Sequence, residues 1–442
     1  MSVIRKRNKD LGLLELVAIA LGGMVGGGIF TVLGISVSMI GNLTPIALII
    51  GGLIALLAAY SYVKLGLYYK DEGATYSFFK RTYPDSHFSA SIIGWFIIFG
   101  YISTLALYSF TFSSYALSAF GFGDVIWARK AAAIFILGVF TLINVWSVNG
   151  MGKIEDIMVY TKLVILVAIS FVLIQYGEVD FNTFLQNMAV DYKNSTVLSV
   201  LIVASVTFVS YEGFQLVINA VNEMTDPDRN IPRAIYLAIF LAIIIYLVIA
   251  TGALFSITPQ EIVKNKEYAL AIGAKNAIGK LGSNLVVLGA VLATSSAISG
   301  TVFGSSRQVA VIATDGYFPK WLSIRKDSIP KNAIYAMTLT ASFLIVIGGL
   351  ELILEFGSIT FLLVSLLMAI ANYKIKEKTK ASTFATSTAI LGLACGGILI
   401  LYYEFTHNWE QMSFIIVLYV ILGLGAWLFA KRHEKKTIKT ID

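Results

Sequence analysis

The sequence predicts an all-α protein that crosses a membrane about twelve times. Of its 442 residues, 57% are apolar and only 13% are charged, whereas about a quarter of the residues in a soluble domain are charged. Apolar runs of about 20 residues, long enough to span the hydrocarbon layer as helices, recur along the whole chain. No polar stretch between them is long enough for a soluble domain, so we treat residues 1–442 as one transmembrane domain.

The apolar runs give the predicted spans in order. They cover residues 12–38, 43–69, 88–118, 131–150, 153–176, 196–222, 232–256, 281–312, 332–350, 352–373, 383–403 and 412–430. The first run follows basic residues, as in a signal peptide, but it is too long and lacks an obvious cleavage site. All seven prolines fall in predicted loops or at helix starts, so any helix break must come from glycine.

Lysine and arginine determine the predicted orientation. With the N-terminus in the cytoplasm, 24 of the 33 basic residues fall in inner segments and 7 in outer segments. An even number of spans returns the C-terminus to the same side. We therefore expect a multi-pass protein of the cell membrane with both termini in the cytoplasm. The net charge of +7 follows from this bias and does not indicate nucleic-acid binding.

The sequence contains no motif for metal or nucleotide chemistry. Cys395 is the single cysteine, and the three histidines lie far apart, so no metal-binding motif is present. The ATP-binding pattern Gly-x-x-x-x-Gly-Lys-[Ser/Thr] does not occur. We expect no enzymatic activity, no metal and no cofactor.

Two spans contain helix-breaking sequences at corresponding places. The first holds five glycines within residues 22–28, and each costs about 1 kcal/mol relative to alanine in a helix. The sixth holds Phe-Val-Ser-Tyr-Glu-Gly at residues 208–213, which places a carboxylate and a glycine at mid-membrane. Paired interruptions of this kind in the two halves of a chain are typical of a transporter's binding site.

The two broken spans each begin a group of five spans. The first group covers about 12–176 and the second about 196–373, with two peripheral helices at about 383–430. Because five is odd, the second group enters the membrane from the opposite side, and the two groups are predicted to be inverted repeats.

A pair of broken helices can bind both ends of an amino acid. A helix N-terminus exposes N–H groups that suit a carboxylate, and a C-terminus exposes carbonyls that suit an ammonium. Glycine also allows a solute to approach the backbone closely. The alternative is that the glycines only allow tight packing between helices.

Four landmarks in the first eight spans resemble those of the amino acid–polyamine–organocation superfamily of permeases. They are Val-Gly-Gly-Gly-Ile-Phe at 25–30, Asp-Glu-Gly-Ala-Thr-Tyr at 71–76, Asn-Glu-Met-Thr-Asp-Pro with Arg-Asn-Ile-Pro-Arg-Ala at 222–234, and Ser-Arg with Asp-Gly-Tyr-Phe-Pro at 306–319. The resemblance implies the LeuT-like fold, in which helices one and six of a 5+5 inverted repeat are discontinuous. It also implies secondary active transport of amino acids by alternating access.

The resemblance further implies a substrate site at the breaks. The amides of Gly27 and Gly28 would hold the carboxylate, and the carbonyls of Met24, Val209 and Glu212 would hold the ammonium. The predicted set is Met24, Gly26, Gly27, Gly28, Val209, Ser210, Glu212 and Gly213. Glu212 departs from the family, where this position is usually apolar. It is predicted to accept a proton, to pair with a cationic substrate, or to donate a hydrogen bond as a protonated acid.

Lys162 is a charged residue predicted deep inside a span. It lies about 14 Å into the fifth helix, counted from Lys153, and an ammonium at such depth costs at least about 2.5–3.5 kcal/mol. In the sodium-independent permeases that the sequence resembles, a lysine here occupies the volume of a sodium site. The predicted coupling set is Lys162, Glu212, Gly22, Gly23, Ser295 and Ser296. The alternative is a lysine that snorkels to the interface.

The leading functional prediction is sodium-independent, proton-coupled uptake of an amino acid. An amino-acid exchanger is the alternative, and a membrane nutrient sensor is a weaker one because the tails are too short for a signalling domain. The expected partners are an amino acid, protons and the lipid bilayer, with no nucleic acid and no obligate protein partner.

Overall fold

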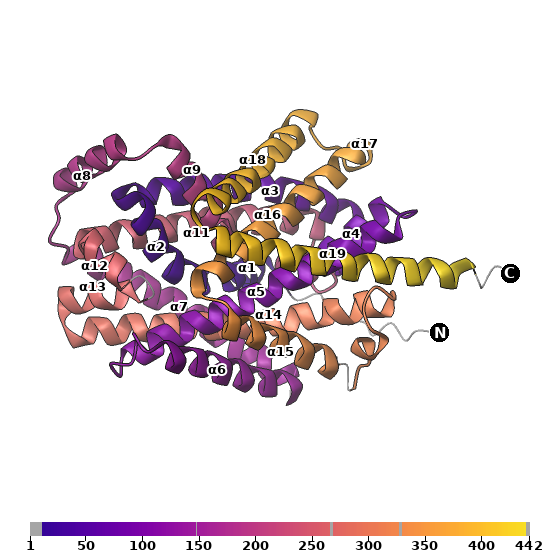
Figure 1. The fold of residues 1–442 in the computed structure, drawn as a ribbon, viewed down its shortest axis with the longest axis horizontal. Helices are drawn as coiled ribbons and strands as arrows, with labels where there is room; N and C mark the ends of the chain where they lie inside the picture. Colours follow the sequence, from indigo (N-terminus) through magenta and orange to yellow (C-terminus); the bar gives the residue numbers. More distant parts are fainter. Residues whose placement is uncertain (1–10, 147, 266–267, 327–328, 439–442) are drawn as a thin grey trace.

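The computed structural model describes residues 11–146, 148–265, 268–326 and 329–438. Within these ranges the secondary structure is helical, apart from two isolated β-bridges that form no strand. Figure 1 shows the long helices packed side by side, with α19 running toward the right end of the view. The prediction of an all-α membrane protein is confirmed.

Most predicted spans correspond to one long helix each. These helices are α3 (Thr44–Tyr69), α5 (His87–Ser118), α6 (Ile126–Trp146), α7 (Val148–Gln175), α11 (Pro227–Ser256), α14 (Lys280–Thr314), α15 (Lys331–Ile347), α16 (Leu350–Lys374), α18 (Thr383–His407) and α19 (Trp409–Ile438). By length and composition, ten stretches of the described chain suit a membrane span. One of these stretches, Gly27–Tyr69, covers part of the first predicted span and the whole of the second. Helix α15, with 17 residues, is shorter than these stretches and corresponds to the ninth predicted span.

The first and sixth predicted spans are the two that the structure interrupts. The first consists of α1 (Leu13–Met24) and α2 (Gly27–Ile40), followed by η1 (Gly41–Leu43). The sixth consists of α9 (Val197–Val206), the 3₁₀ segment η2 (Thr207–Tyr211), a turn, and the short α10 (Leu216–Asn219). In that turn Gly213 has φ of +127°, a conformation that side chains with a Cβ rarely adopt.

The start of the seventh span was predicted wrongly. Helix α11 begins at Pro227 and not at residue 232, so Pro232 lies inside a helix, contrary to the prediction that no proline does. Pro227 is well suited to the first helical position, where no N–H is needed. Pro232 stands in the second turn, where a proline removes only one hydrogen bond close to the helix end.

Several segments between the spans are helical although the hydropathy pattern does not predict them. They are α4 (Ala74–Thr82), α8 (Phe181–Asn194), α12 (Pro259–Lys264), α13 (Ala269–Ile278), α17 (Lys376–Thr379) and the 3₁₀ segment η3 (Lys320–Ser323). Each is too short to cross a membrane. Helix α4 packs against α5, and α8 packs against η1, so these helices cover the ends of the bundle.

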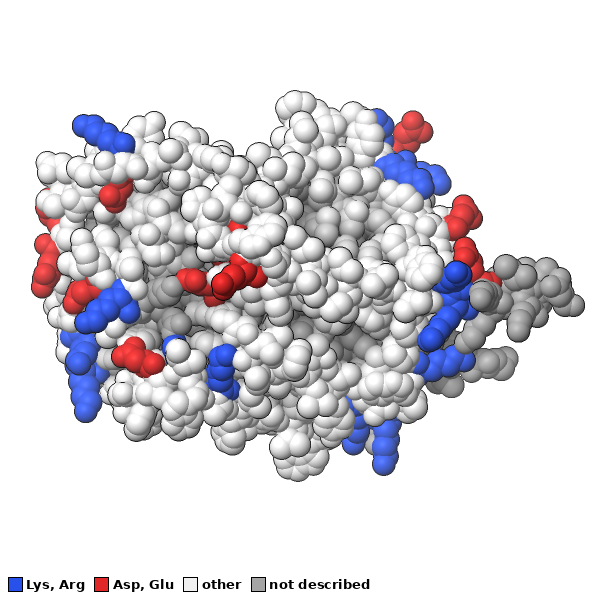
Figure 2. Space-filling model, viewed as in Figure 1, with Lys and Arg blue, Asp and Glu red and all other residues white. Residues whose placement is uncertain are grey.

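Charged side chains gather toward the left and right ends of the molecule in Figure 2, and most of the surface between them is uncharged. This distribution fits a protein whose middle faces lipid. Several basic residues that predict the orientation lie outside the described residues: Arg5, Lys6, Arg7, Lys9, Lys266 and Lys439. The cytoplasmic placement of both termini and the inverted relation of the two halves stay predictions.

Candidate functional site

The ammonium of Lys162 lies at the break in the first span. Its Nζ donates to the carbonyl oxygens of Gly22 at 2.9 Å and Val25 at 2.8 Å, and to Ser296 Oγ at 3.3 Å. The side chain is 0% exposed, which argues against a lysine that snorkels to the interface. Lys162 therefore connects α7 to the end of α1 and to the middle of α14.

The predicted partners of Lys162 are brought together only in part. Gly22 and Ser296 bond to it, while the carbonyl of Val25 is a partner that the sequence analysis missed. The Gly23 carbonyl instead accepts from the Tyr108 hydroxyl at 3.3 Å. Ser295 precedes Ser296 and is buried within α14.

Glu212 lies at the break in the sixth span and is 4% exposed. Its Oε2 accepts from Gln215 Nε2 at 2.7 Å, and Gln215 Oε1 accepts from the amide of Gly213 at 3.1 Å. In the described chain Glu212 Oε1 has no hydrogen-bond partner. One Gln215 side chain thus connects the carboxyl to the turn, and one carboxyl oxygen is left for a further donor.

The Tyr246 hydroxyl lies between the two breaks. It is 2.7 Å from the Met24 carbonyl oxygen and 2.6 Å from the Ser210 carbonyl oxygen. A hydroxyl donates one hydrogen at a time, so the two carbonyls share it. The Val209 carbonyl accepts from the Glu212 amide at 3.2 Å. A carbonyl oxygen has two lone pairs. The Met24 carbonyl also accepts from the Gly26 amide at 2.9 Å, so both of its positions are used, whereas the Val209 carbonyl retains one.

The predicted substrate-binding residues all lie at these two breaks. They are Met24, Gly26, Gly27, Gly28, Val209, Ser210, Glu212 and Gly213. A Cβ added to Gly28 would stand 2.9 Å from Ser210 Cα, and one added to Gly213 would stand 2.6 Å from the carbonyl carbon of Gly23. The close approach of the two breaks alone requires glycine at 28 and 213, so glycine there does not distinguish packing from substrate binding.

Polar side chains surround a small cavity beside Glu212. Its volume is about 20 Å³, and its wall includes Tyr101, Tyr108, Gln215 and Ser305 as well as Glu212. That volume holds about one water molecule and is too small for an amino acid. The two breaks therefore face each other in a closed arrangement.

A model of the amino acid permease family matches residues 11–441. The chain belongs to this family. The match confirms the resemblance to the amino acid–polyamine–organocation superfamily.

The permease is similar along nearly its full length to several bacterial and archaeal proteins. It is 28% identical to the inner membrane transport protein YbaT of Escherichia coli, with 97% of each chain covered. It is 26% identical to an uncharacterized protein of Methanocaldococcus jannaschii, with 99% and 98% covered. It is 23% identical to the branched-chain amino acid permease BcaP of Bacillus subtilis, with 97% and 94% covered. Family and names support amino acid transport across a membrane.

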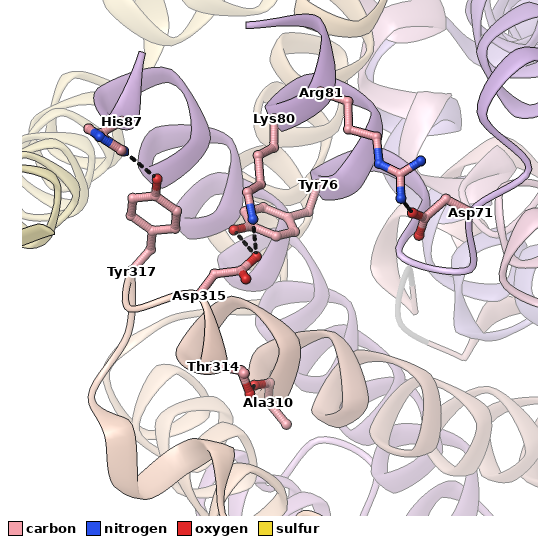
Figure 3. Close-up of polar contacts among 9 residues, drawn as sticks. All are labelled: Asp71, Tyr76, Lys80, Arg81, His87, Ala310, Thr314, Asp315 and Tyr317. Carbon is pink, nitrogen blue, oxygen red and sulfur yellow. Dashed lines mark hydrogen bonds and ion pairs between the residues drawn. The ribbon is translucent and has the colours of Figure 1, made fainter. Parts of the chain in front are cut away.

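The structure also brings together landmarks that are distant in the permease sequence. Figure 3 shows Asp315, after α14, accepting from Lys80 Nζ and from the Tyr76 hydroxyl, both at 2.7 Å. His87 Nδ1 lies 2.9 Å from the Tyr317 hydroxyl. Burial, and then the Asp315 carboxylate, raises the pKa of Tyr76 above its usual value, and the same causes raise the pKa of Tyr317 to about 12. Both phenols stay protonated near neutral pH and hold this end of the bundle together.

Gln215 and Tyr246 are the site residues that the sequence analysis missed. An isolated glutamine after Gly-Phe carries no motif, and a tyrosine in an apolar run usually belongs to the core or to the interfacial belt. The only signal was position, because Gln215 follows the helix-breaking glycine by two residues. The partner carbonyls of Tyr246 come from spans one and six, and only the fold shows that these meet.

Proposed function

We propose that the permease carries amino acids across the cell membrane by alternating access, without sodium and coupled to protons. The observation that carries the proposal is the set of oxygens around Lys162. Two carbonyls and one hydroxyl surround its ammonium, and oxygens of this kind are the ligands that hard cations prefer. While protonated, the ammonium supplies a positive charge where a sodium ion would otherwise be needed.

The substrate would lie between the two breaks. Helix α2 begins at Gly27, so its first amides have no partner within the helix and face the break with partial positive charge. They suit the carboxylate of an amino acid. The remaining acceptor position of Val209 suits its ammonium, and the Met24 carbonyl can join it when the Tyr246 hydroxyl turns to Ser210. The name of the Bacillus subtilis relative, a branched-chain amino acid permease, supports amino acids as the substrate class.

Protonation of Lys162 would couple the proton to the movement. While charged, the ammonium ties the end of α1 to α7 and α14. A neutral amine donates weaker hydrogen bonds to carbonyls, because charge-assisted hydrogen bonds are about twice as strong as neutral ones. Loss of the proton would loosen α1 from α14 and allow the closed arrangement of the two breaks to open.

Transport by the purified permease in proteoliposomes tests the proposal. Uptake of labelled amino acids is expected to persist when potassium or choline replaces sodium, and an inward proton gradient is expected to drive accumulation. Strict dependence on sodium would refute the proposal. Exchange of internal for external amino acid, with no accumulation under a proton gradient, would instead favour the exchanger.

A further inference from the structure

A second buried acidic group lies far along the bundle from the Lys80–Asp315 contact. Glu355 stands in the second turn of α16. The other end of that helix lies beside α4 and the Lys80–Asp315 contact, since Lys374 Nζ is 3.9 Å from the centre of the Tyr83 ring. Glu404 stands in the last turn of α18, which packs along α16. Figure 1 shows these two helices side by side.

Glu404 carries a fully buried carboxyl group. Its side chain is 0% exposed, and within the described residues neither of its carboxyl oxygens has a hydrogen-bond partner. Glu355, 5% exposed, faces it across the helix interface, and Glu351 lies one turn before Glu355.

Within the part of the chain that the structure describes, the groups that act on the Glu404 carboxyl are the acids Glu355 and Glu351 and the side-chain amide of Asn408. Glu355 and Glu351 belong to α16, and Tyr403 belongs to the same helix as Glu404. His407, one turn later, stacks on the Tyr403 ring with 4.8 Å between centroids. Helices α3, α9 and α19 also pack against α18, while the groups that act on Glu404 come from α16 and from Asn408, the residue that follows α18. Two adjacent buried carboxylates cannot both keep a negative charge there, because like charges and the loss of water both disfavour ionisation.

We propose that Glu404 and Glu355 form a proton-binding site that is separate from Lys162 and Glu212. The pair holds one proton between two carboxyl groups, as paired carboxylates do elsewhere. The ligand is the proton itself and not a metal ion.

An open cavity lies one helical turn from Glu355 of this pair. Its volume is about 430 Å³, and its lining includes Ile35 of α2, Glu351 at the start of α16, and Glu410 and Gln411 at the start of α19. Figure 2 shows acidic side chains on this face that lie inward from the charged left end. Glu351 lines the cavity and lies one turn from Glu355, so it connects solvent to the buried pair.

Hydrogen bonds connect the same part of α16 to the substrate site. The Ser358 hydroxyl, three residues after Glu355, donates to the Val206 carbonyl at 2.6 Å. Val206 ends α9, directly before the break in the sixth span. The Ser103 hydroxyl of α5 donates to the Ile353 carbonyl at 2.7 Å. A proton that changes the packing of Glu355 against Glu404 therefore acts on α16, which is bonded to the break in the sixth span. The link from this proton site to transport rests on the proposed function.

Infrared difference spectroscopy on the purified full-length permease tests the site without requiring transport. A band from a protonated carboxyl is expected to appear as pH falls. Glu404→Gln or Glu355→Gln should remove it, and Glu410→Gln, an exposed carboxylate in the same cavity, should leave it. Should Glu404→Gln fail to fold, Glu355→Gln provides the same readout. A band that persists in the folded variants overturns the site, and so does a band that sodium or potassium abolishes at fixed pH.

Uptake into proteoliposomes at fixed internal pH tests the link to the break. In the wild type and in Glu410→Gln, the uptake rate should change with the pH of the solution on the cavity side of the membrane. In Glu404→Gln that change in uptake rate should be at least threefold smaller. Loss of the infrared band with an unchanged pH response overturns the link but supports the site. If no amino acid is transported at all, the proposed function fails, and the infrared result still decides whether the pair binds a proton.

Discussion

The two broken spans satisfy their freed backbone groups in different ways. The first break is short, and the Lys162 ammonium from another helix takes the carbonyls of Gly22 and Val25. The sixth break is longer, and Gln215 within the break itself bonds both the Gly213 amide and the Glu212 carboxyl. The first break is therefore held by a remote charge that can be lost, whereas the groups that hold the sixth, Gln215 and the Tyr246 hydroxyl, are neutral. If transport is coupled to protons as proposed, the first break is the one that loss of a proton would release.

The largest effect is expected where the two breaks touch. A Cβ at Gly28 would stand 2.9 Å from Ser210 Cα, and backbone cannot move aside as a flexible side chain can. Overpacking of this kind costs about 1–3 kcal/mol or more. Gly28→Val should abolish amino acid binding, measured by calorimetry on purified protein.

Gly138→Val is the matched control for that substitution. Gly138 lies in α6, and an added Cβ there would meet nothing within 4 Å, so binding should remain within about twofold, or about 0.4 kcal/mol. Normal affinity in Gly28→Val would mean that the breaks can separate without loss of the substrate site.

Lys162→Ala tests whether the remote charge is what holds the first break. It leaves the Gly22 and Val25 carbonyls without their donor, and each buried acceptor left without a partner costs about 1–3 kcal/mol. Proton-driven accumulation should fall at least about tenfold, or about 1.4 kcal/mol, while exchange of amino acid across the membrane continues. Lys275→Ala, at an exposed lysine of α13, should behave as the wild type. Accumulation that survives in Lys162→Ala at its normal pH dependence would assign this lysine a structural role only.

The features that the sequence predicted correctly are those that composition and glycine content encode locally. Apolar runs gave the spans, and the glycines at 22–28 together with Glu212 and Gly213 gave the two interruptions. The depth of Lys162 predicted a buried ammonium because the cost of placing a charge there is independent of the fold.

The features that were missed depend on which helices meet. Val25 bonds to Lys162 through its backbone, which no residue type reveals, and Tyr246 acts through two carbonyls from other spans. The start of α11 was misplaced because hydropathy marks where the apolar run begins. The helix itself begins at Pro227, after Asp226 adopts a left-handed conformation with φ of 42°.

Glu212→Gln separates the possible roles of the carboxyl at the sixth break. The amide keeps the shape and can still bond Gln215, but it carries neither charge nor exchangeable acid proton. Since Gln215 and the Tyr246 hydroxyl still hold the sixth break, the protein should stay folded. If Glu212 carries a proton, the dependence of uptake on pH flattens for every substrate. If it pairs with a cationic substrate, binding of basic amino acids falls about tenfold, or about 1.4 kcal/mol, and neutral ones are spared.

One result would contradict both of those roles. If affinity, selectivity and pH dependence all match the wild type, the carboxyl only donates a hydrogen bond within the break. Gln215→Leu then becomes the informative variant, because it removes the bonds to Glu212 Oε2 and to the Gly213 amide together.

The smallest effect is expected for Tyr246→Phe, which removes the one hydroxyl that the two breaks share. Its O–H donates to only one of the Met24 and Ser210 carbonyls at a time, so the variant loses one hydrogen bond, worth about 0.5–1.5 kcal/mol. The ring, which packs against Tyr211 with 5.1 Å between centroids, stays in place. Uptake should therefore fall only about two- to tenfold, with unchanged selectivity. Because the hydroxyl occupies one acceptor position on Met24, its removal also frees that carbonyl for a substrate ammonium. If substrate affinity rises while the transport rate falls, the hydroxyl holds the closed arrangement; if both fall together, it positions the substrate site directly.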